Sequence, residues 1–220
     1  MTLDLERLAR VFPGPSVVSR HDDCRECVVA EKWVSGRDAA EGRPSGPART
    51  VYDLLPSWLQ AAFEWGPVQW PFHWCDLFKA TEVDCGVFSY LCSYLLVRRG
   101  VLHFRAQVVL PCTRQESGHW RGMWDLPGFS DDWILTDLLV YHEAIALPEA
   151  QGAVVLFDTT DLRVLGPEQA DSRYRPRAVR VESAGLDLET RTVLLNESVV
   201  PLGEWRLSPS SHGREGSGVA

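Results

Sequence analysis

Cys85, His142 and Asp158 are residues whose side chains could together carry out nucleophilic catalysis. A thiol is a useful nucleophile only as the thiolate, and a free cysteine with a pKa of about 8.5 is mostly protonated at neutral pH. A helix N-terminus lowers that pKa, and so does a nearby imidazole that holds the proton and is itself oriented by a carboxylate. Cys85 has the first of these by its position, and His142 with Asp158 would supply the second.

The position of Cys85 follows from the residues around it. The sequence predicts an apolar helix from about 82 to 98, followed by a strand over 102–110. Thr81 can cap the helix, with Asp84 three residues later as a variant capping box. The helix ends in basic residues and a glycine, as helix C-termini prefer: Arg98, Arg99 and Gly100. Cys85 then lies in the first turn, where Asp84 opposes thiolate formation unless its charge is used in capping.

The histidine and the aspartate are brought together by a predicted hairpin. The connection PEAQG separates strands over 139–147 and 153–159 and is centred on Ala150. In a hairpin with this centre, His142 lies directly opposite Asp158, and directly opposed residues share a face of the sheet. The other residues of that face are apolar: Ala144, Ala146, Val154 and Leu156. The alternatives are an exposed pair at a strand end, or a core histidine satisfied by its neighbour.

Composition limits the class of protein. The chain has 220 residues, 45% of them hydrophobic, with nine tryptophans and a formal net charge of −8. This length favours one domain with a sizeable core, and the lack of a basic run argues against nucleic acid as a partner. The N-terminus lacks the pattern of a signal peptide, and the longest apolar run, 87–97, is too short to cross a membrane. We therefore expect a cytoplasmic protein without a membrane partner, whose six cysteines are free thiols.

The chain divides into three parts by composition. Residues 1–48 are expected to form a helical segment followed by a mobile Gly- and Pro-rich linker. The linker composition covers 36–49, so its last residue is the first residue of the next part. Residues 49–207 form the expected core, and 208–220 have the composition of a disordered tail. Within the core, helix is expected over 50–65, followed by an irregular tryptophan-rich stretch over 65–75. Two more strands are expected from RAVRVES and TRTVLLNESVV.

These residues resemble a known family. A cysteine that opens a buried helix, an RRG stop, an FRAQVVL strand, then a histidine and an aspartate on successive strands are similar to the core of the transglutaminase-like proteins, within the papain-like group. The likeness covers about residues 80–162. It implies an α+β fold, with the cysteine helix packed on an antiparallel sheet. It also implies that Cys85 is the nucleophile, His142 the base and Asp158 the orienting carboxylate, with no cofactor.

Other side chains could line the same site. Gln107 is a single amide in an apolar strand and could donate to an oxyanion, or it could lie on the solvent face of that strand. Trp74 could line the pocket or pack in the core. Residues 112–132, which contain Trp120 and Trp124, form a long loop that could close over the cleft or pack permanently.

A second group of residues has the spacing of metal ligands. His21, Cys24 and Cys27 recur at intervals of three, but three ligands need a fourth, and no nearby residue offers an obvious one. The alternative is a helix start at which the two cysteines pack or form a redox pair. We therefore expect no metal, with these three residues as weak candidates.

The function expected from the sequence is thiol-dependent acyl transfer or amide-bond hydrolysis through a thioester. Its substrate would be a small molecule or a peptide with an amide or acyl group. The alternative is a binding or scaffold protein that keeps the fold without turnover, since Ala144 stands where the family often has a tryptophan two residues after the histidine. The oligomeric state is left open by the sequence.

Overall fold

The computed structural model describes residues 16–41, 51–116, 134–136, 139–148, 154–166, 169–176, 178–187 and 192–201. The tail 208–220 and most of the loop 112–132, including Trp120 and Trp124, lie outside these residues. The helices are α2 (Arg25–Glu41), α3 (Trp58–Ala62) and α4 (Cys85–Arg98). Three short 3-10 turns accompany them: η1 (Val51–Leu54), η2 (Trp74–Phe78) and η4 (Ser172–Tyr174).

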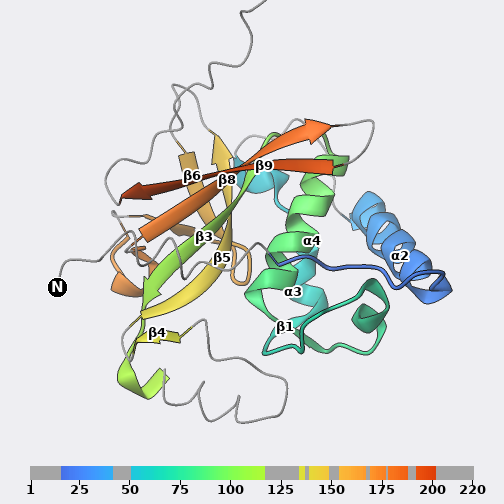
Figure 1. The fold of residues 1–220 in the computed structure, drawn as a ribbon, viewed down its shortest axis with the longest axis horizontal. Helices are drawn as coiled ribbons and strands as arrows, with labels where there is room; N and C mark the ends of the chain where they lie inside the picture. The colour runs from blue at the N-terminus through green and yellow to red at the C-terminus, as the bar shows by residue number, and fades with distance from the viewer. Residues whose placement is uncertain are drawn as a thin grey trace, which may run out of the picture.

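The described strands form one large antiparallel sheet and one small parallel pair. The large sheet has the order β7-β6-β5-β3-β8-β9, and β4 also pairs with β5 (Figure 1). Its strands are β3 (Phe104–Pro111), β4 (Ile134–Thr136), β5 (Leu139–Pro148), β6 (Val154–Asp158), β7 (Arg163–Leu165), β8 (Ala178–Asp187) and β9 (Thr192–Pro201). The small pair joins β1 (Glu64–Trp65) to β2 (Glu82–Val83). The fold is therefore mixed helix and sheet, and the predicted pairing of 139–147 with 153–159 is confirmed.

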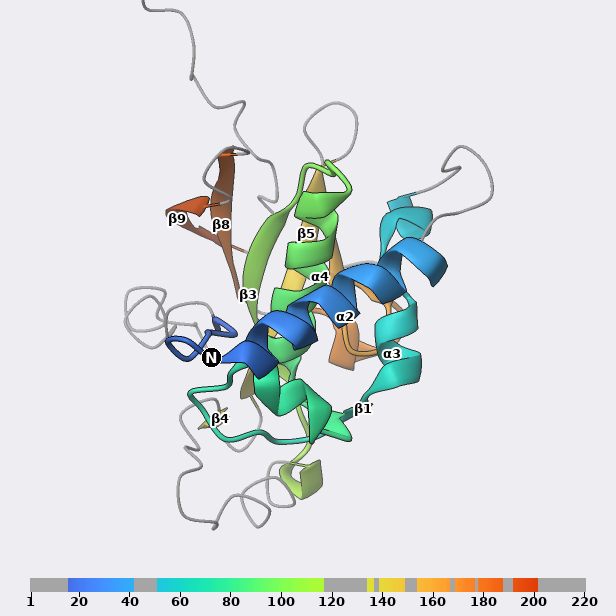
Figure 2. The same ribbon diagram turned by 90° about the vertical axis from the view of Figure 1, so that its right-hand side faces the viewer.

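Helix α4 stands between the large sheet and helix α2 (Figures 1 and 2). Apolar residues cover most of its surface, so it packs on both sides. The main core cluster joins its buried face to Ile145 and Phe157 of the sheet on one side, and to Ala30 and Val34 of α2 on the other. A second cluster covers the opposite face of the sheet and contains Ala144, Ala146 and Leu156. Although α4 is apolar, no helix among the described residues is long and apolar enough to cross a bilayer.

The ends of α4 confirm part of the prediction and correct the rest. Gly100 follows the helix with a φ of +69°, a conformation in which glycine is favoured, so the predicted glycine stop is confirmed. The helix begins at Cys85, however, and not near residue 82. Asp84 itself is the N-cap, since its side chain accepts the N–H of Val87. Thr81 is therefore not the cap, because residues 82–83 are used in strand β2.

Two other expectations for the N-terminal half are wrong. Helix α2 runs to Glu41, so residues 36–41 of the predicted linker are helical, while 42–50 lie outside the described residues. The helix expected over 50–65 is broken into η1, the single short helix α3 and strand β1. Pro56, which has no N–H to donate, lies between η1 and α3 and accounts for the break.

The hairpin of β5 and β6 has a different register from the predicted one. Ala144, not His142, lies opposite Asp158, and Leu147 pairs with Val155. Partners therefore sum to 302 instead of 300, a shift of two residues. Since the side chains of a strand alternate with a period of two, this shift leaves every residue on its predicted face. His142 becomes the diagonal neighbour of Asp158, at the point where β5 extends past the end of β6.

A buried ion pair fixes the C-terminal end of α4. Arg99 donates to Asp38 of α2 from Nε at 3.0 Å and from Nη2 at 2.5 Å. The indole N–H of Trp58 in α3 donates to the same carboxylate at 2.9 Å. The Asp38 and Arg99 side chains are 11% and 12% exposed, so the pair is largely shielded from water. One carboxylate thus joins three helical elements that lie far apart in the sequence.

We predict that Asp38→Ala lowers the free energy of unfolding by about 3 kcal/mol, because it leaves the Arg99 guanidinium buried without its partner. Lys32→Ala, an exposed charge change on the same helix, should change stability by less than about 0.5 kcal/mol. Urea unfolding followed by tryptophan fluorescence measures both. Equal effects of the two substitutions would contradict the role of this ion pair.

Candidate functional site

Cys85 occupies the first position of α4, immediately after a cap that is itself anchored. The Asp84 carboxylate accepts the Val87 N–H at 2.9 Å through Oδ1 and the indole N–H of Trp70 at 2.7 Å through Oδ2. Asp84 is thus the cap of the helix, although capping does not remove the effect of its charge on the neighbouring thiol. Cys85 is partly exposed, whereas Gly86 and Val87 beyond it are buried. Cys85 therefore lies at the boundary between solvent and the buried part of the helix, while its thiol is enclosed enough for burial to dominate its pKa.

The turn after Cys85 is tightly enclosed. A Cβ atom on Gly86 would overlap the Ser16 hydroxyl and would lie 3.1 Å from the ring of Trp70. Glycine is therefore required here by the close approach of two other segments, and not by its backbone angles. The first residues of the described chain and the tryptophan-rich stretch both converge on the N-terminal end of α4.

His142 and Asp158 form an ion pair, as the hairpin argument predicted, but as diagonal neighbours and not as directly opposed residues. The distance from His142 Nε2 to Asp158 Oδ1 is 2.9 Å, although the contact departs from the linear geometry of a good hydrogen bond. The two side chains are 13% and 8% exposed. Asp158 is held in turn by Thr160, whose backbone N–H and hydroxyl donate to it at 2.9 and 2.6 Å. The carboxylate is thus fixed before it meets the imidazole.

The thiol of Cys85 lies close to the His142 imidazole, since each group shifts the pKa of the other. His142 shares a face of the sheet with Ala144 and Leu156, which pack away from α4, so the thiol meets the imidazole where β5 extends past the end of β6. Burial would lower the pKa of His142, but Asp158 and Cys85 together raise it well above its ordinary value. Burial would raise the pKa of Asp158, but the imidazole lowers it below its ordinary value. His142 and Asp158 therefore favour the imidazolium and the carboxylate form, respectively.

The thiol does not gain enough from this setting to ionise at rest. Burial raises the pKa of Cys85 above its ordinary value, and the effect of His142 in the opposite direction is smaller. The negative charges of Asp84 and Glu143 raise it further. The expectation of a lowered thiol pKa is therefore not met in the resting arrangement: the helix N-terminus and the imidazole do not offset burial and two nearby carboxylates.

The cap residue titrates close to neutrality. Burial raises the pKa of Asp84 to about 6, although the bonds from Val87 and Trp70 act in the opposite direction. Since the ordinary pKa of this side chain is lower, its ionisation costs stability, and the cost is relieved as pH falls below about 6. Protonation would also remove one of the two negative charges that act on Cys85.

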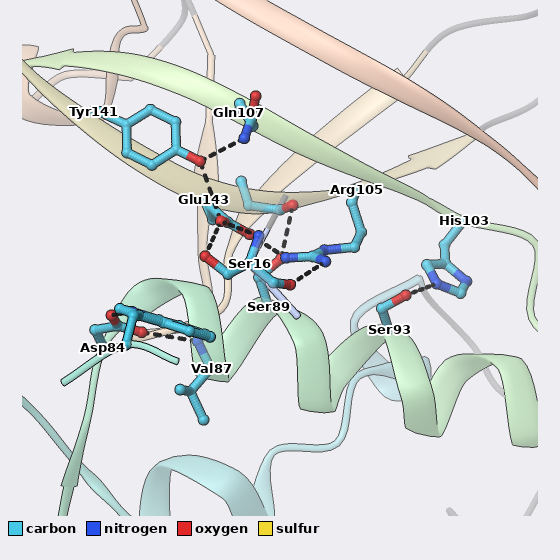
Figure 3. A network of polar contacts seen from close by, with 12 residues as sticks. Ser16, Asp84, Val87, Ser89, Ser93, His103, Arg105, Gln107, Tyr141 and Glu143 are labelled. Carbon is cyan, nitrogen blue, oxygen red and sulfur yellow. Dashed lines mark hydrogen bonds and ion pairs between the residues drawn. The ribbon is translucent and has the colours of Figure 1, made fainter. Parts of the chain in front are cut away.

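A buried polar network joins strands β3 and β5 to Ser16 (Figure 3), and sequence reasoning missed it. Glu143, the residue after His142, forms an ion pair with Arg105 of β3 and accepts bonds from the Ser16 N–H at 2.9 Å and the Tyr141 hydroxyl at 3.1 Å. Arg105 also donates to the Ser16 carbonyl at 2.6 Å. The available signal was charge in strands that are otherwise apolar: Arg105 and Glu143 are 6% and 1% exposed. The network holds the N-terminal segment against the sheet beside Cys85.

Gln107 and Trp74 are both buried. Gln107 is 1% exposed, so the solvent-face alternative is wrong, and its amide nitrogen donates to the Tyr141 hydroxyl at 2.6 Å. This joins it to the network of Glu143. Trp74 is 3% exposed and packs edge-on against Tyr90 and Tyr94 of α4. It therefore lies in the core, which was the alternative to a pocket wall.

The other cysteines of α4 and β3, and the histidine between these two elements, are buried. Burial raises the pKa of Cys92 to about 12, in agreement with its position one layer deeper along α4. Cys112 is buried as well. His103 is 1% exposed and its ring bonds the Ser93 hydroxyl at 2.7 Å and the Val101 carbonyl at 2.9 Å, while burial lowers its pKa. Burial accounts for the two cysteines, and burial with two hydrogen bonds accounts for His103.

A cluster of thiols, separate from Cys85, lies at the start of α2. Cys75 of η2 joins Cys24 and Cys27, and the three sulfur atoms lie within 4.8 Å of one another. Burial, with the two neighbouring thiols, raises the pKa of Cys75 to about 12. The sequence indicated Cys24 and Cys27 but missed Cys75, which is 48 residues further along. Within the described part of the chain, this is the group with the chemistry of a metal site.

We predict that Gly86→Ala destabilises the protein by roughly 1–3 kcal/mol, because Ser16 and Trp70 must move to admit a Cβ atom. Gly36→Ala is the matched control: it lies within α2 with no atom within 4 Å of the new Cβ. Because alanine favours helix over glycine, Gly36→Ala should stabilise by about 0.5–1 kcal/mol. Urea unfolding measures the change in the free energy of unfolding of both variants. A Gly86→Ala variant as stable as the wild type would contradict the enclosed helix start.

We predict that Asp84→Asn speeds alkylation of Cys85 roughly 2- to 10-fold at pH 7.5, since it removes a negative charge that raises the thiol pKa while it keeps a capping oxygen. In the wild type the rate should increase with pH above the ordinary pKa of histidine, because the Cys85–His142 pair must lose a proton first. Limiting iodoacetamide with peptide mass spectrometry gives the rate. Exposed Asp53→Asn is the control, and an unchanged rate in folded Asp84→Asn would contradict the electrostatic assignment.

Comparison with known proteins gave no match that bears on this site. No protein-family model matches the sequence. The searches of curated proteins and of solved structures found no match either. The assignment of a function therefore depends on the residues themselves.

Proposed function

We propose that this protein transfers acyl groups through a thioester on Cys85, in an active site of the transglutaminase-like, papain-like kind. The observation that supports this most is the row Asp158–His142–Cys85, which begins with a carboxylate fixed by Thr160 and ends at a helix N-terminus. Nucleophile, base and orienting group are the parts that acyl transfer by a thiol needs. They come from α4, β5 and β6, which are rigid elements joined by the core.

The ring nitrogens of His142 have separate tasks in this proposal. Asp158 faces Nε2, so Nδ1 is the nitrogen that exchanges a proton with the thiol. The Cys85 proton passes to Nδ1 as the sulfur forms a bond to the substrate carbonyl carbon. The imidazolium then returns that proton to the leaving group as its bond to carbon breaks, and a thioester remains. Water or an amine then attacks the thioester carbon and gives a proton to His142. The bond from carbon to sulfur breaks, and the thiolate of Cys85 takes the proton back from His142.

The resting protonation state sets a condition on this chemistry. The pKa values of Cys85 and His142 are both raised, which favours the form of the pair that holds both protons. The reactive pair is one proton poorer, either as thiol and imidazole or as thiolate and imidazolium. Turnover therefore increases with pH through the apparent pKa of the pair, and this places the optimum on the alkaline side of neutrality.

The helix start also supplies a donor for the developing oxyanion. The N–H of Cys85 is at the first helical position, which has no acceptor within the helix, and the Asp84 carboxylate is directed at Val87 instead. A tetrahedral intermediate on the sulfur would place its oxygen near this N–H group. This is the donor that the proposal requires from the backbone.

The acyl acceptor is either water, which makes the protein an amidase or peptidase, or an amine, which makes it an amide-forming transferase. The same three residues serve both reactions. The net charge of −8 favours substrates or acceptors with a basic group, because opposite charges attract them to the surface.

A binding or scaffold role is the second candidate, and one observation favours it. Ser16 and Trp70 lie against Gly86, the residue next to the thiol, so the helix start is enclosed on that side. A site that keeps its three residues but admits no substrate would bind a partner without turnover. The two functions differ in whether an acyl group can be placed on Cys85.

We predict that p-nitrophenyl acetate acetylates Cys85, because an activated ester tests the nucleophile without a known substrate. Intact-protein and peptide mass spectrometry should find one acetyl group, which hydroxylamine removes as expected for a thioester. Cys85→Ala should abolish it, and His142→Ala should slow it about 10²-fold or more. Asp158→Asn should slow it less.

Two controls separate catalysis from general reactivity. Cys112→Ala and Asp161→Asn should acetylate at the wild-type rate, since neither residue belongs to the row. Acetylation spread over several cysteines, or a His142→Ala variant as fast as the wild type, would reject the enzyme. A folded protein that gives no adduct would favour the binding role.

A further inference from the structure

A cluster of three thiols joins the N-terminal helix to the tryptophan-rich stretch, and the acyl-transfer chemistry does not use it. Cys24 precedes α2, Cys27 lies in its first turn, and Cys75 lies in η2. Their sulfur atoms are within 4.8 Å of one another. Four sulfurs at the corners of a zinc tetrahedron with bonds of about 2.3 Å are about 3.8 Å apart. Small side-chain rotations therefore suffice to bring the three to that spacing.

The backbone holds the two halves of the cluster together independently of the thiols. Residues 16–24 run beside residues 70–75, where Ser19 donates to the Phe72 carbonyl and Trp74 donates to the Ser19 carbonyl, each at 3.0 Å. This bridge is parallel and pairs Ser19 with His73. The thiols thus meet on a preformed frame and do not depend on a flexible loop.

A histidine precedes the thiols in each segment. Among the described residues, neither histidine has a ring nitrogen within 4.8 Å of all three sulfur atoms, so an imidazole must rotate to become the fourth ligand. His21 is three residues before Cys24, and His73 is two residues before Cys75. Their rings stack with centroids 3.5 Å apart and an angle of 15° between their planes. The Nδ1 atom of His73 lies 3.5 Å from a carboxylate oxygen of Asp76, so Nε2 is the ring nitrogen that would bind a metal. A carboxylate that orients the second ring nitrogen is the usual companion of a histidine ligand.

We propose that Cys24, Cys27 and Cys75 bind a zinc ion, with an imidazole of the His21–His73 pair, preferably His73, as the fourth ligand. On binding, the three thiols release their protons and form three Zn–S bonds, and a neutral imidazole completes a site of net charge −1. Thiolates with one imidazole suit zinc, and four protein ligands are typical of a structural site. The Cys24-x₂-Cys27 spacing at a helix start agrees with this geometry.

The zinc ion would fix the segment that carries the cap of α4. Residues 70–78 include both Cys75 and Trp70, and the latter donates to Asp84 beside the nucleophile. A metal that joins this segment to α2 therefore stabilises the fold, because the ligands are assembled only in the folded chain. The inference is independent of the proposed acyl transfer, since the metal takes no part in that reaction.

Metal analysis of the full chain, purified with a phosphine reductant and without chelator, is the first test. Plasma mass spectrometry should find one zinc ion per chain. Cys24→Ser, Cys27→Ser and Cys75→Ser should each lose most of it, whereas Cys85→Ser and Cys112→Ser should retain it. His73→Ala and His21→Ala identify the fourth ligand, as the one whose loss lowers zinc content more.

A second measurement uses the wild-type protein and does not depend on folded variants. After zinc is removed with a chelator, Co²⁺ should bind at one equivalent and give the thiolate-to-cobalt absorption and the intense visible bands of a tetrahedral site. Zinc removal should also lower the melting temperature, and added zinc should restore it.

Several outcomes would overturn the proposal. One is a folded wild type with little zinc and no tetrahedral cobalt spectrum. Another is an intact mass two hydrogens lighter, with a disulfide among these three residues in the presence of reductant. A third is full zinc content in Cys75→Ser. Loss of acetylation in a protein that retains zinc would reject only the proposed function.

Discussion

The Asp84 carboxylate is the interaction on which the arrangement of the site depends. It accepts one bond from the first turn of α4 and another from the indole of Trp70, so it fixes the start of the helix and the tryptophan-rich stretch together. Cys85 follows directly, and its position is a consequence of where the cap lies. Burial of this charge is costly, as the pKa of about 6 shows, and the cost is offset by two hydrogen bonds and the helix N-terminus.

The buried ion pair of Arg105 and Glu143 has a related role on the sheet side. An ion pair in an apolar core stabilises a fold little by itself, because both charges lose their water. Its value here is positional: Glu143 also bonds Ser16, and Ser16 packs on Gly86 of α4. The chain before α2 is thereby held against the sheet and the helix start at the same time. A hydrophobic pair could fill the same volume but could not bond the Ser16 backbone.

The electrostatics of the site form a balance between carboxylates and one imidazolium. Asp158 raises the pKa of His142, while burial, with smaller effects from Asp84 and Glu143, raises the pKa of Cys85. A thiol in this setting is protected from casual oxidation, since the thiolate is the reactive form. The negative charges around the thiol thus act against its ionisation.

The sequence by itself determined the elements and the faces of the residues. The apolar helix ending at Gly100, the hairpin after it, and the common face of His142 and Asp158 all follow from local periodicity and from glycine and charge preferences. Even the error of two residues in the hairpin register left the faces unchanged, because a strand repeats every two residues.

Only the tertiary structure decided which residues from separate elements meet. The contact of Cys85 with His142, the bond from Trp70 to Asp84 and the arrival of Cys75 beside Cys24 and Cys27 join segments from 14 to 57 residues apart. Long-range contacts of this kind depend on how helices and strands pack, which no local pattern encodes. Burial of the whole site, which reverses the expected direction of the Cys85 pKa, is a property of that packing as well.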